Sequence, residues 1–291
     1  MTTIASSPIR DVSDTALWVA IWRAMESERS DALFHDPYAR RLGGKRGEAI
    51  AARMGGGKSN WPIVVRTVVM DEIVLRCVHD GAATVLNLAA GLDARPYRLD
   101  LPATLRWLHV DLPDMVEYFR SNMAAETPRC ELEFVAADMR DPDAKRALFE
   151  RVAAMPGPVL VITEGLLLYL EADQVTDLAR DLHDRSRARW WLTDLASPQL
   201  LRFLEHRWKP TLLQANAPFR FGPAQGAAFF APQGWREAEF HSTIVDAYRL
   251  KRAMPLAWLW RLLSMLQPRS RRIAAIRMSS VVLLEREEAT P

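Results

Sequence analysis

The sequence has few cysteines, almost no net charge and no long apolar run. Only Cys77 and Cys130 occur among its 291 residues, which excludes the disulfide framework of small secreted proteins. The formal net charge of +2 is too small for the whole surface to attract nucleic acid. The apolar segment 158–170 is interrupted by Thr163 and Glu164 and is shorter than the ~20 residues of a membrane-spanning helix. We therefore expect neither nucleic acid nor a membrane as a partner.

The first residues, MTTIASSPIRDVSD, show no basic stretch followed by an apolar core. We therefore expect no secretory signal, a cytoplasmic protein and two reduced cysteines. A chain of 291 residues is long enough to bury a core without disulfides.

The first quarter of the chain is predicted to be helical. Apolar residues recur at helical spacing, and no segment before residue 80 shows the pattern of a strand. The predicted helices cover residues 14–29, 37–42, 47–54 and 63–79. We interpret residues 1–80 as a helical cap on a second domain, residues 81–291.

From residue 84 onward, short apolar runs alternate with helical patterns. The runs cover residues 84–88, 105–110, 131–136, 158–163 and 190–193, and the helices between them residues 114–125, 143–154 and 172–186. This alternation predicts an α/β fold with a parallel sheet and helices on both faces. Two further strands would complete a mostly parallel, seven-stranded sheet, at residues 235–244 and 278–285. A helix is predicted between them at Tyr248–Leu266. That last helix is basic on one side, and we expect it to pack on the core rather than lie on a membrane surface.

The strands predicted after the first one share an acidic residue at the carboxyl end. These residues are Asp111, Asp138, Glu164 and Asp194, whereas the first strand ends at a turn containing Gly91. In open parallel sheets, ligands bind beyond the carboxyl ends of the strands. We therefore expect the acids to line one crevice.

The turn after the first strand consists of small residues, which allow a ligand to approach the backbone closely. It differs from the dinucleotide pattern G-x-G-x-x-G because Ala89 replaces a glycine. Asp111, about twenty residues later, is placed to accept hydrogen bonds from both hydroxyls of a ribose. Asp138 is similarly placed to accept from the amino group of an adenine. Both acids could instead cap the turns that follow them, and the sequence leaves these alternatives open.

Several motifs in series resemble those of the leucine carboxyl methyltransferase family, which includes bacterial polyketide O-methyltransferases. Asn87-Leu-Ala-Ala-Gly-Leu-Asp-Ala-Arg-Pro-Tyr-Arg-Leu99 is similar to N-L-G-A-G-L-D-T-R-x-Y-R-L, and Thr163-Glu-Gly-Leu-Leu-Leu-Tyr-Leu170 to T-E-G-L-L-x-Y-L. Four shorter segments also fit the family's motifs in the expected order: Asp31–Tyr38, Arg66–Thr67, Val110–Pro113 and Ala137–Arg140. The resemblance covers roughly residues 15–187.

The resemblance implies a Rossmann-like methyltransferase fold that binds S-adenosyl-L-methionine, with no metal. By position, Arg66 would pair with the methionyl carboxylate of the cofactor, and Glu164 would lie near its ammonium and sulfonium groups. The resemblance also implies Ala89 and Gly91 at the methionyl group, Asp111 at the ribose, and Asp138 with Met139 at the adenine. Asn87, Asp93, Arg95 and Leu112 would lie elsewhere in the cofactor site. Tyr169 and Glu164 would position the reacting groups. Because Ala89 replaces the usual glycine, the resemblance leaves the cofactor affinity in question.

Residues 198–234 interrupt the alternation and are predicted to form a lid over the substrate. The aromatic residues of this segment are Phe203, Trp208, Phe219, Phe221, Phe229 and Phe230. They favour a small apolar or aromatic acceptor, such as a polyketide. Alternatively, they attach the lid to the core. No motif indicates a general base, and the scattered histidines are expected to be structural. This pattern favours a carboxylate acceptor, which is ionised at pH 7, over a hydroxyl, which a base would assist.

Two other functions remain open at this stage. One is a protein that keeps the fold and binds the cofactor without turnover, which Ala89 would favour. The other is a nicotinamide-dependent oxidoreductase, against which the missing G-x-G-x-x-G and the presence of Arg66 and Glu164 argue. The sequence does not determine the acceptor, the pathway, or whether two copies form a homodimer.

Overall fold

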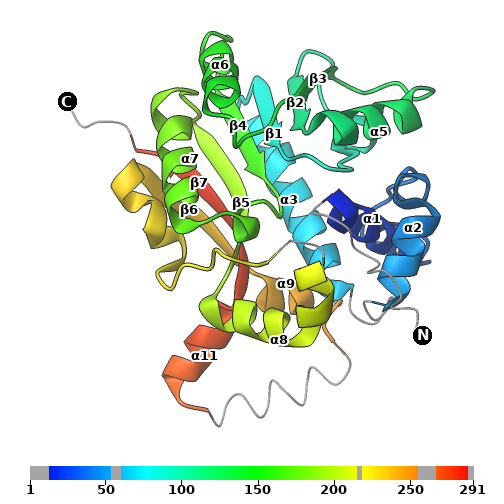
Figure 1. The fold of residues 1–291 in the computed structure, drawn as a ribbon, viewed down its shortest axis with the longest axis vertical. Coiled ribbons are helices and arrows are strands. Elements are labelled where there is room, and N and C mark those ends of the chain that lie inside the picture. Colours follow the sequence, from blue (N-terminus) through cyan, green and yellow to red (C-terminus); the bar gives the residue numbers. More distant parts are fainter. Residues whose placement is uncertain (1–12, 54–59, 215–217, 255–266, 288–291) are drawn as a thin grey trace, which may run out of the picture.

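Seven strands form a single sheet in the order β3-β2-β1-β4-β5-β7-β6 (Figure 1). This computed structural model describes residues 13–53, 60–214, 218–254 and 267–287. Strands β1 to β5 pair in parallel, and β7 runs antiparallel between β5 and β6. The strands are β1 (Thr84–Leu88), β2 (Arg106–Asp111), β3 (Glu131–Ala136), β4 (Val159–Thr163), β5 (Trp190–Ala196), β6 (Trp235–Ser242) and β7 (Ser279–Arg286). The mostly parallel, seven-stranded α/β fold predicted from the sequence is therefore confirmed.

Helices precede the sheet and alternate with its strands. Those before β1 are α1 (Ser13–Ser27), α2 (Ala39–Arg53) and α3 (Trp61–His79). Those that follow are α4 (Arg95–Arg98), α5 (Pro113–Met123), α6 (Pro142–Ala153), the 3₁₀ turn η2 (Leu167–Tyr169), α7 (Ala172–Asp184), α8 (Pro198–Gln214), the 3₁₀ turn η3 (Gly226–Gln233), α9 (Thr243–Arg249) and α11 (Arg269–Ile276). The two helices predicted at 37–42 and 47–54 are joined in α2 across a kink at Gly44, whose φ is +56°.

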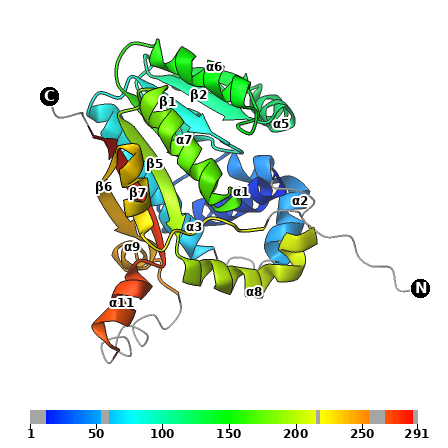
Figure 2. The ribbon, with the colours of Figure 1, turned by 60° about the vertical axis from the view of Figure 1, so that its left-hand side comes forward.

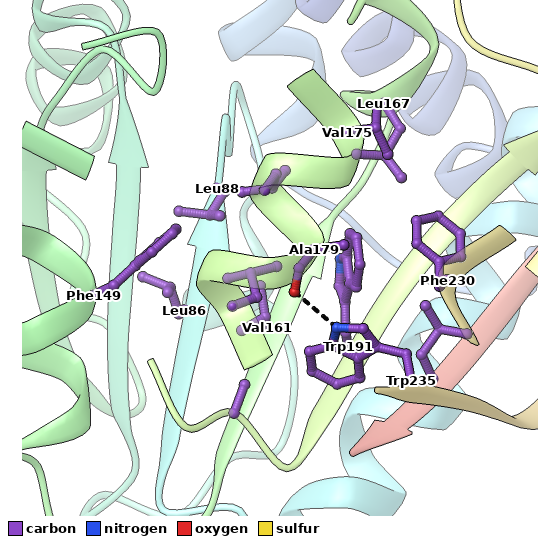
Figure 3. Packing of buried hydrophobic residues seen from close by; sticks show 14 of the residues in the cluster. Leu86, Leu88, Phe149, Val161, Leu167, Val175, Ala179, Trp191, Phe230 and Trp235 are labelled. Atoms are coloured by element: carbon purple, nitrogen blue, oxygen red, sulfur yellow. Dashed lines mark hydrogen bonds between the residues drawn. The ribbon is translucent and has the colours of Figure 1, made fainter. Parts of the chain in front are cut away.

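The central strands are buried on both faces, as their continuous apolar sequences predict. Every residue of β1 and β4 is buried. Leu86 and Val161 point toward α6 and α7 and contact a cluster that includes Phe149 and Trp191 (Figure 3). Trp235 closes this cluster, and its indole N–H donates to the carbonyl of Ala179 at 2.9 Å. The alternate residues face α3 on the opposite side, so the core has two layers around one sheet.

The N-terminal helices are tied to the C-terminal part of the chain by a buried ion pair. Helix α1 packs on α2 and α3 (Figures 1 and 2). Its Glu26 accepts hydrogen bonds from Arg252 at 2.8 Å and from the Leu33 amide at 3.0 Å. Only 2% of the Glu26 side chain and 9% of the Arg252 side chain are exposed. The helices before β1 are therefore fastened to the segment that follows α9.

Two details of the sequence prediction differ from the structure. Strand β5 extends to Ala196, so Asp194 lies inside this strand instead of after it. The helix predicted at Tyr248–Leu266 is wrong at its start, because α9 already ends at Arg249 and residues 250–254 are not helical. Residues 255–266 lie outside the described residues. The segment predicted as a lid forms α8 and η3. Among the described residues, no helix is long and apolar enough to cross a membrane.

Candidate functional site

A cavity of about 1860 Å³ opens beyond the carboxyl ends of the parallel strands. Cavities that hold one small molecule usually measure ~300–1,000 Å³, so this one has room for two ligands side by side. One part of its wall is charged and comes from the strand ends. Another part is apolar and comes from α1, α3, η2, α8 and the segment 218–221.

Most residues that the sequence places in the site line this cavity. They are Arg66, Asn87, Ala89, Gly91, Asp93, Asp111, Leu112, Asp138, Met139, Glu164 and Tyr169. Arg95 is the exception: its side chain is only 2% exposed and lies behind the wall. The four acids expected at one crevice, Asp111, Asp138, Glu164 and Asp194, all reach it.

The turn between β1 and α4 is joined to the end of β2 by a carboxylate. The Gly91 amide donates to Asp111 Oδ2 at 2.6 Å, and the Leu112 amide donates to Asp111 Oδ1 at 2.7 Å. Burial raises the pKa of Asp111 although both amides favour its ionised form. A carboxylate offers about four lone-pair sites, so each oxygen can still accept a bond from a ligand.

Ala89, the residue that departs from the family motif, adopts a left-handed backbone conformation with φ +50°. An L-residue with a Cβ pays ~1–2 kcal/mol in this region, and glycine does not. We expect Ala89→Gly to raise the free energy of unfolding by about 1 kcal/mol, measured by urea denaturation. Ala90→Gly is the matched control, because Ala90 is not among the residues with positive φ. Equal destabilisation by both substitutions would contradict this explanation.

Glu164, directly after β4, lies between two arginines. Its Oε1 is 3.0 Å from Arg66 Nη2, and its Oε2 accepts a hydrogen bond from Arg95 Nη1 at 2.8 Å. Burial alone would raise the pKa of Glu164, but the two guanidinium groups hold it well below its usual range. Glu164 is therefore ionised near pH 7, and its lowered pKa makes it a weak base.

Asp194 on β5 was expected in the crevice, but the sequence assigned it no contact there. Its Oδ2 accepts a hydrogen bond from Arg66 Nη1 at 3.0 Å, and its Oδ1 accepts from the Gly165 amide at 2.6 Å. Asp194 thus orients Arg66 and the backbone that carries Glu164. The signal that placed it in the crevice is its position: like the other three acids, it stands at the predicted carboxyl end of a strand.

Arg95 is the centre of a buried ion network behind the cavity wall. Its Nε donates to Asp71 at 2.7 Å and its Nη1 to Asp93 at 2.8 Å. Asp93 also accepts from the Asn87 side chain at 2.8 Å, and Arg98 makes two further bonds to Asp71. Asn87, Asp93 and Arg95 therefore brace the turn and hold Glu164 in place.

Asp138 lies at the rim of the cavity, two residues after the end of β3. It accepts hydrogen bonds from the Arg140 amide at 2.9 Å and from Arg140 Nη2 at 2.7 Å. The Arg140 side chain lowers the pKa of Asp138. The turn-capping contact that the sequence left open is thus present, and Met139 beside it also lines the cavity.

The aromatic residues of the predicted lid divide between the cavity and the core. Phe203, Phe219 and Phe221 line the cavity, and the Phe219 ring lies 5.6 Å from that of Tyr169. Phe230 instead packs edge-on against Trp191 at 4.9 Å, next to Phe229. The Trp208 side chain lies outside the described residues. Some of these aromatic residues therefore line the cavity, whereas others attach the segment to the core.

His109 on β2 is a structural residue and does not line the cavity. It is fully buried, and its ring stacks on Phe119 at 4.5 Å. Burial lowers the pKa of His109 from 6.5 to about 4.

This pKa shift predicts a loss of stability in acid. Between pH 6.5 and 4 the unfolded chain binds a proton at His109 that the folded protein excludes. The free energy of unfolding should therefore fall by about 3 kcal/mol as the pH is lowered through this window. Urea denaturation across the window, with wild type and His109→Phe compared, measures it. The same pH dependence in both proteins would contradict this role of His109.

Comparison with known proteins places the chain among methyltransferases. A model of the leucine carboxyl methyltransferase family matches residues 16–183. A Parafrankia protein described as a candidate S-adenosyl-L-methionine-dependent methyltransferase is 34% identical over 84% of this chain and 83% of its own length. A relative from Mycobacteroides abscessus with the same description is 37% identical, but the match spans only 59% of this chain and 61% of that relative.

Solved structures support the fold. A protein of the DUF574 family from Streptomyces avermitilis superposes with a TM-score of 0.60 and 15% identity, covering 92% of this chain and 96% of its own. A candidate methyltransferase from Thermobifida fusca superposes with a TM-score of 0.56 and 16% identity, covering 97% of this chain and 96% of its own. At these identities the likeness bears on the fold alone.

Proposed function

This chain belongs to the leucine carboxyl methyltransferase family of S-adenosyl-L-methionine-dependent methyltransferases, and from that premise we propose that it methylates a carboxylate oxygen of a small apolar or aromatic molecule. The observation that carries the proposal is the divided cavity. It is large enough for a cofactor and an acceptor, with a charged wall at the strand ends and an apolar wall at α1, α8 and residues 218–221.

The charged wall suits S-adenosyl-L-methionine by its donors and acceptors. The cofactor carries an ammonium, a sulfonium and a carboxylate, besides the hydroxyls of its ribose and the amino group of its adenine. Glu164 offers an anion, Arg66 a guanidinium fork, and Asp111 a carboxylate with free acceptor sites. In the proposal, Arg66 holds the carboxylate, Glu164 faces the cations, Asp111 holds the ribose, and Asp138 with Met139 holds the adenine. Ala89 and Gly91 leave room for the methionyl group.

The titratable groups beside the apolar wall favour an acceptor that needs no deprotonation. Glu164 stays ionised because Arg95 and Arg66 lower its pKa. Burial raises the pKa of Tyr169, so its phenol keeps its proton. Both groups are therefore poorly suited to remove a proton from a hydroxyl acceptor near pH 7, whereas a carboxylate acceptor is already ionised. Tyr169 can donate a hydrogen bond and so orient such an acceptor.

When bound, the cofactor supplies an electrophilic methyl group on sulfur. With the cofactor held by Arg66, Glu164 and Asp194, this methyl group would pass to a carboxylate oxygen of the acceptor, giving a methyl ester and S-adenosylhomocysteine. The protein contributes alignment, which supplies up to ~7–11 kcal/mol in well-oriented systems. Arg66, Glu164 and Asp194 hold one partner, while Tyr169 and Phe219 confine the other.

The test is methyl transfer from labelled S-adenosyl-L-methionine to matched pairs of aromatic carboxylic acids and phenols. We expect the label on the acids, and we expect mild base to release it as methanol, since esters hydrolyse and ethers do not. Label on the phenols that resists base would overturn the choice of acceptor. Cofactor binding with no transfer to any acceptor would favour a binding protein instead.

A further inference from the structure

Helix α11 makes little contact with the rest of the protein. None of its residues is buried. It lies at one end of the molecule, beyond α8 and β7, in both views (Figures 1 and 2). Packing on the core therefore does not account for its sequence.

The surface of α11 is strongly basic. Arg269, Arg271 and Arg272 are exposed on the helix, and exposed Arg277 follows it directly. No acidic residue occurs in the sequence between Asp246 and Glu285. The whole chain has a net charge of only +2, so this concentration of positive charge is a local property. It is complementary to an anionic partner.

Apolar side chains are exposed among these arginines. Ile273 is 46% exposed, Ile276 39% and Met278 40%. Ile273 follows Arg269 by four residues, and Ile276 follows Arg272 by four residues. Because residues three and four apart are neighbours on a helix surface, these two isoleucines and two arginines lie on one side of α11. Short apolar groups flanked by arginines suit the boundary between lipid headgroups and acyl chains, where arginine reaches the phosphates and isoleucine enters the apolar layer.

The same region borders the cavity. Three residues of this region line the cavity: Met254, five residues after the end of α9, Ala275 on α11, and Met278, which follows α11. Met254 and Met278 are also 37% and 40% exposed. The cavity therefore reaches the surface of the protein next to the arginines.

We propose that α11 docks on an anionic membrane surface and places this opening of the cavity against the lipid. An apolar acceptor would then enter from the bilayer; this second part rests on the proposed function, whereas docking does not. The sequence led us to expect no membrane partner because no segment can span one. Contact with the surface requires only the basic and apolar groups that α11 presents.

The experiment is co-sedimentation of the full-length protein with vesicles of phosphatidylglycerol and phosphatidylcholine, compared with vesicles of phosphatidylcholine alone. The test variant is Arg269→Gln/Arg272→Gln, which removes the two arginines on the same side of α11 as the isoleucines; neither residue lines the cavity. The matched control is Arg120→Gln/Arg146→Gln, on α5 and α6 at the other end of the molecule (Figure 1). Both double variants remove two exposed positive charges.

We expect wild type and control to bind the anionic vesicles and the test variant to bind about 30-fold more weakly, because each arginine near an anionic surface contributes about fivefold. Binding should also weaken as salt is added. Absence of wild-type binding to anionic vesicles would overturn the proposal and direct the search to an acidic protein partner. Equal loss in test and control variants would overturn it as well, since net charge alone would then explain binding. Because no turnover is measured, these outcomes are independent of the methyltransferase reaction.

Discussion

Arg95→Met is expected to lower the free energy of unfolding by about 4 kcal/mol, since removing one partner of a buried ion pair typically costs ~3–5 kcal/mol. Arg95 is the shared partner of Asp71, Asp93 and Glu164 at 2.7–2.8 Å. Methionine fills much of the space but leaves three carboxylates short of a cation in a region from which water is largely excluded. The cost therefore comes from the stranded anions more than from lost packing.

Urea denaturation of wild type and variant near pH 7 measures this effect. Arg120→Met is the matched control, because the Arg120 side chain is 61% exposed and its ion pair is with Glu117, three residues earlier on the same helix. It should change stability by less than ~0.5 kcal/mol. The loss in Arg95→Met should shrink in acid, because Arg95 lowers the pKa of Glu164 and the stabilisation that this provides is lost as the pH falls below the ordinary pKa of a glutamate. A loss below ~1 kcal/mol, or one that does not depend on pH, would show that the network does not hold the site.

Arg66→Met is expected to weaken the binding of S-adenosylhomocysteine by about 100-fold, with a smaller effect on stability. Charge-assisted hydrogen bonds contribute ~1.5–3 kcal/mol each, and the Arg66 fork is the group proposed to hold the cofactor's carboxylate. Arg66 lies on the cavity wall with 15% of its side chain exposed, whereas Arg95 lies behind the wall. Calorimetric titration gives the affinity, and the same samples give the melting temperature.

Two further variants separate charge from geometry at this position. Arg66→Lys keeps the charge but loses the planar fork, so it should bind more tightly than Arg66→Met and more weakly than wild type. Arg140→Met, at the rim of the same cavity, controls for the loss of any nearby cation and should cost less. Unchanged affinity in Arg66→Met would mean that the cofactor's carboxylate is held elsewhere.

The parallel strands could be predicted to within a few residues because short runs of strand-forming residues alternate with helical patterns along the chain. Residues 84–88 and 131–136 were predicted with the bounds that the structure shows. The helix predicted at Tyr248–Leu266 is wrong at its start, because α9 ends at Arg249. Helical periodicity alone does not fix where a helix ends, and Pro255 is the sequence signal against one continuous helix.

The acids of the site could also be predicted, because their positions follow from where strands end. The contacts that orient them could not. Arg95 meets Asp71, which is 24 residues earlier on α3, and Arg66 meets Asp194, which is 128 residues later on β5. Such pairs depend on how α3 packs across the sheet, and local patterns do not specify that. Ala89 shows the reverse case: the sequence marked it as unusual, and its positive φ gives the physical reason why glycine suits this position.

The central claim is that the charged wall of the cavity binds S-adenosyl-L-methionine. Calorimetric titration of the purified protein with S-adenosylhomocysteine, alongside Asp111→Ala, tests it most directly. Asp111 joins the turn at Gly91 to the end of β2, and it is the residue proposed to hold the ribose. We predict micromolar binding to wild type and its loss in the variant. Failure of wild type to bind, or equal binding by Asp111→Ala, would contradict the account.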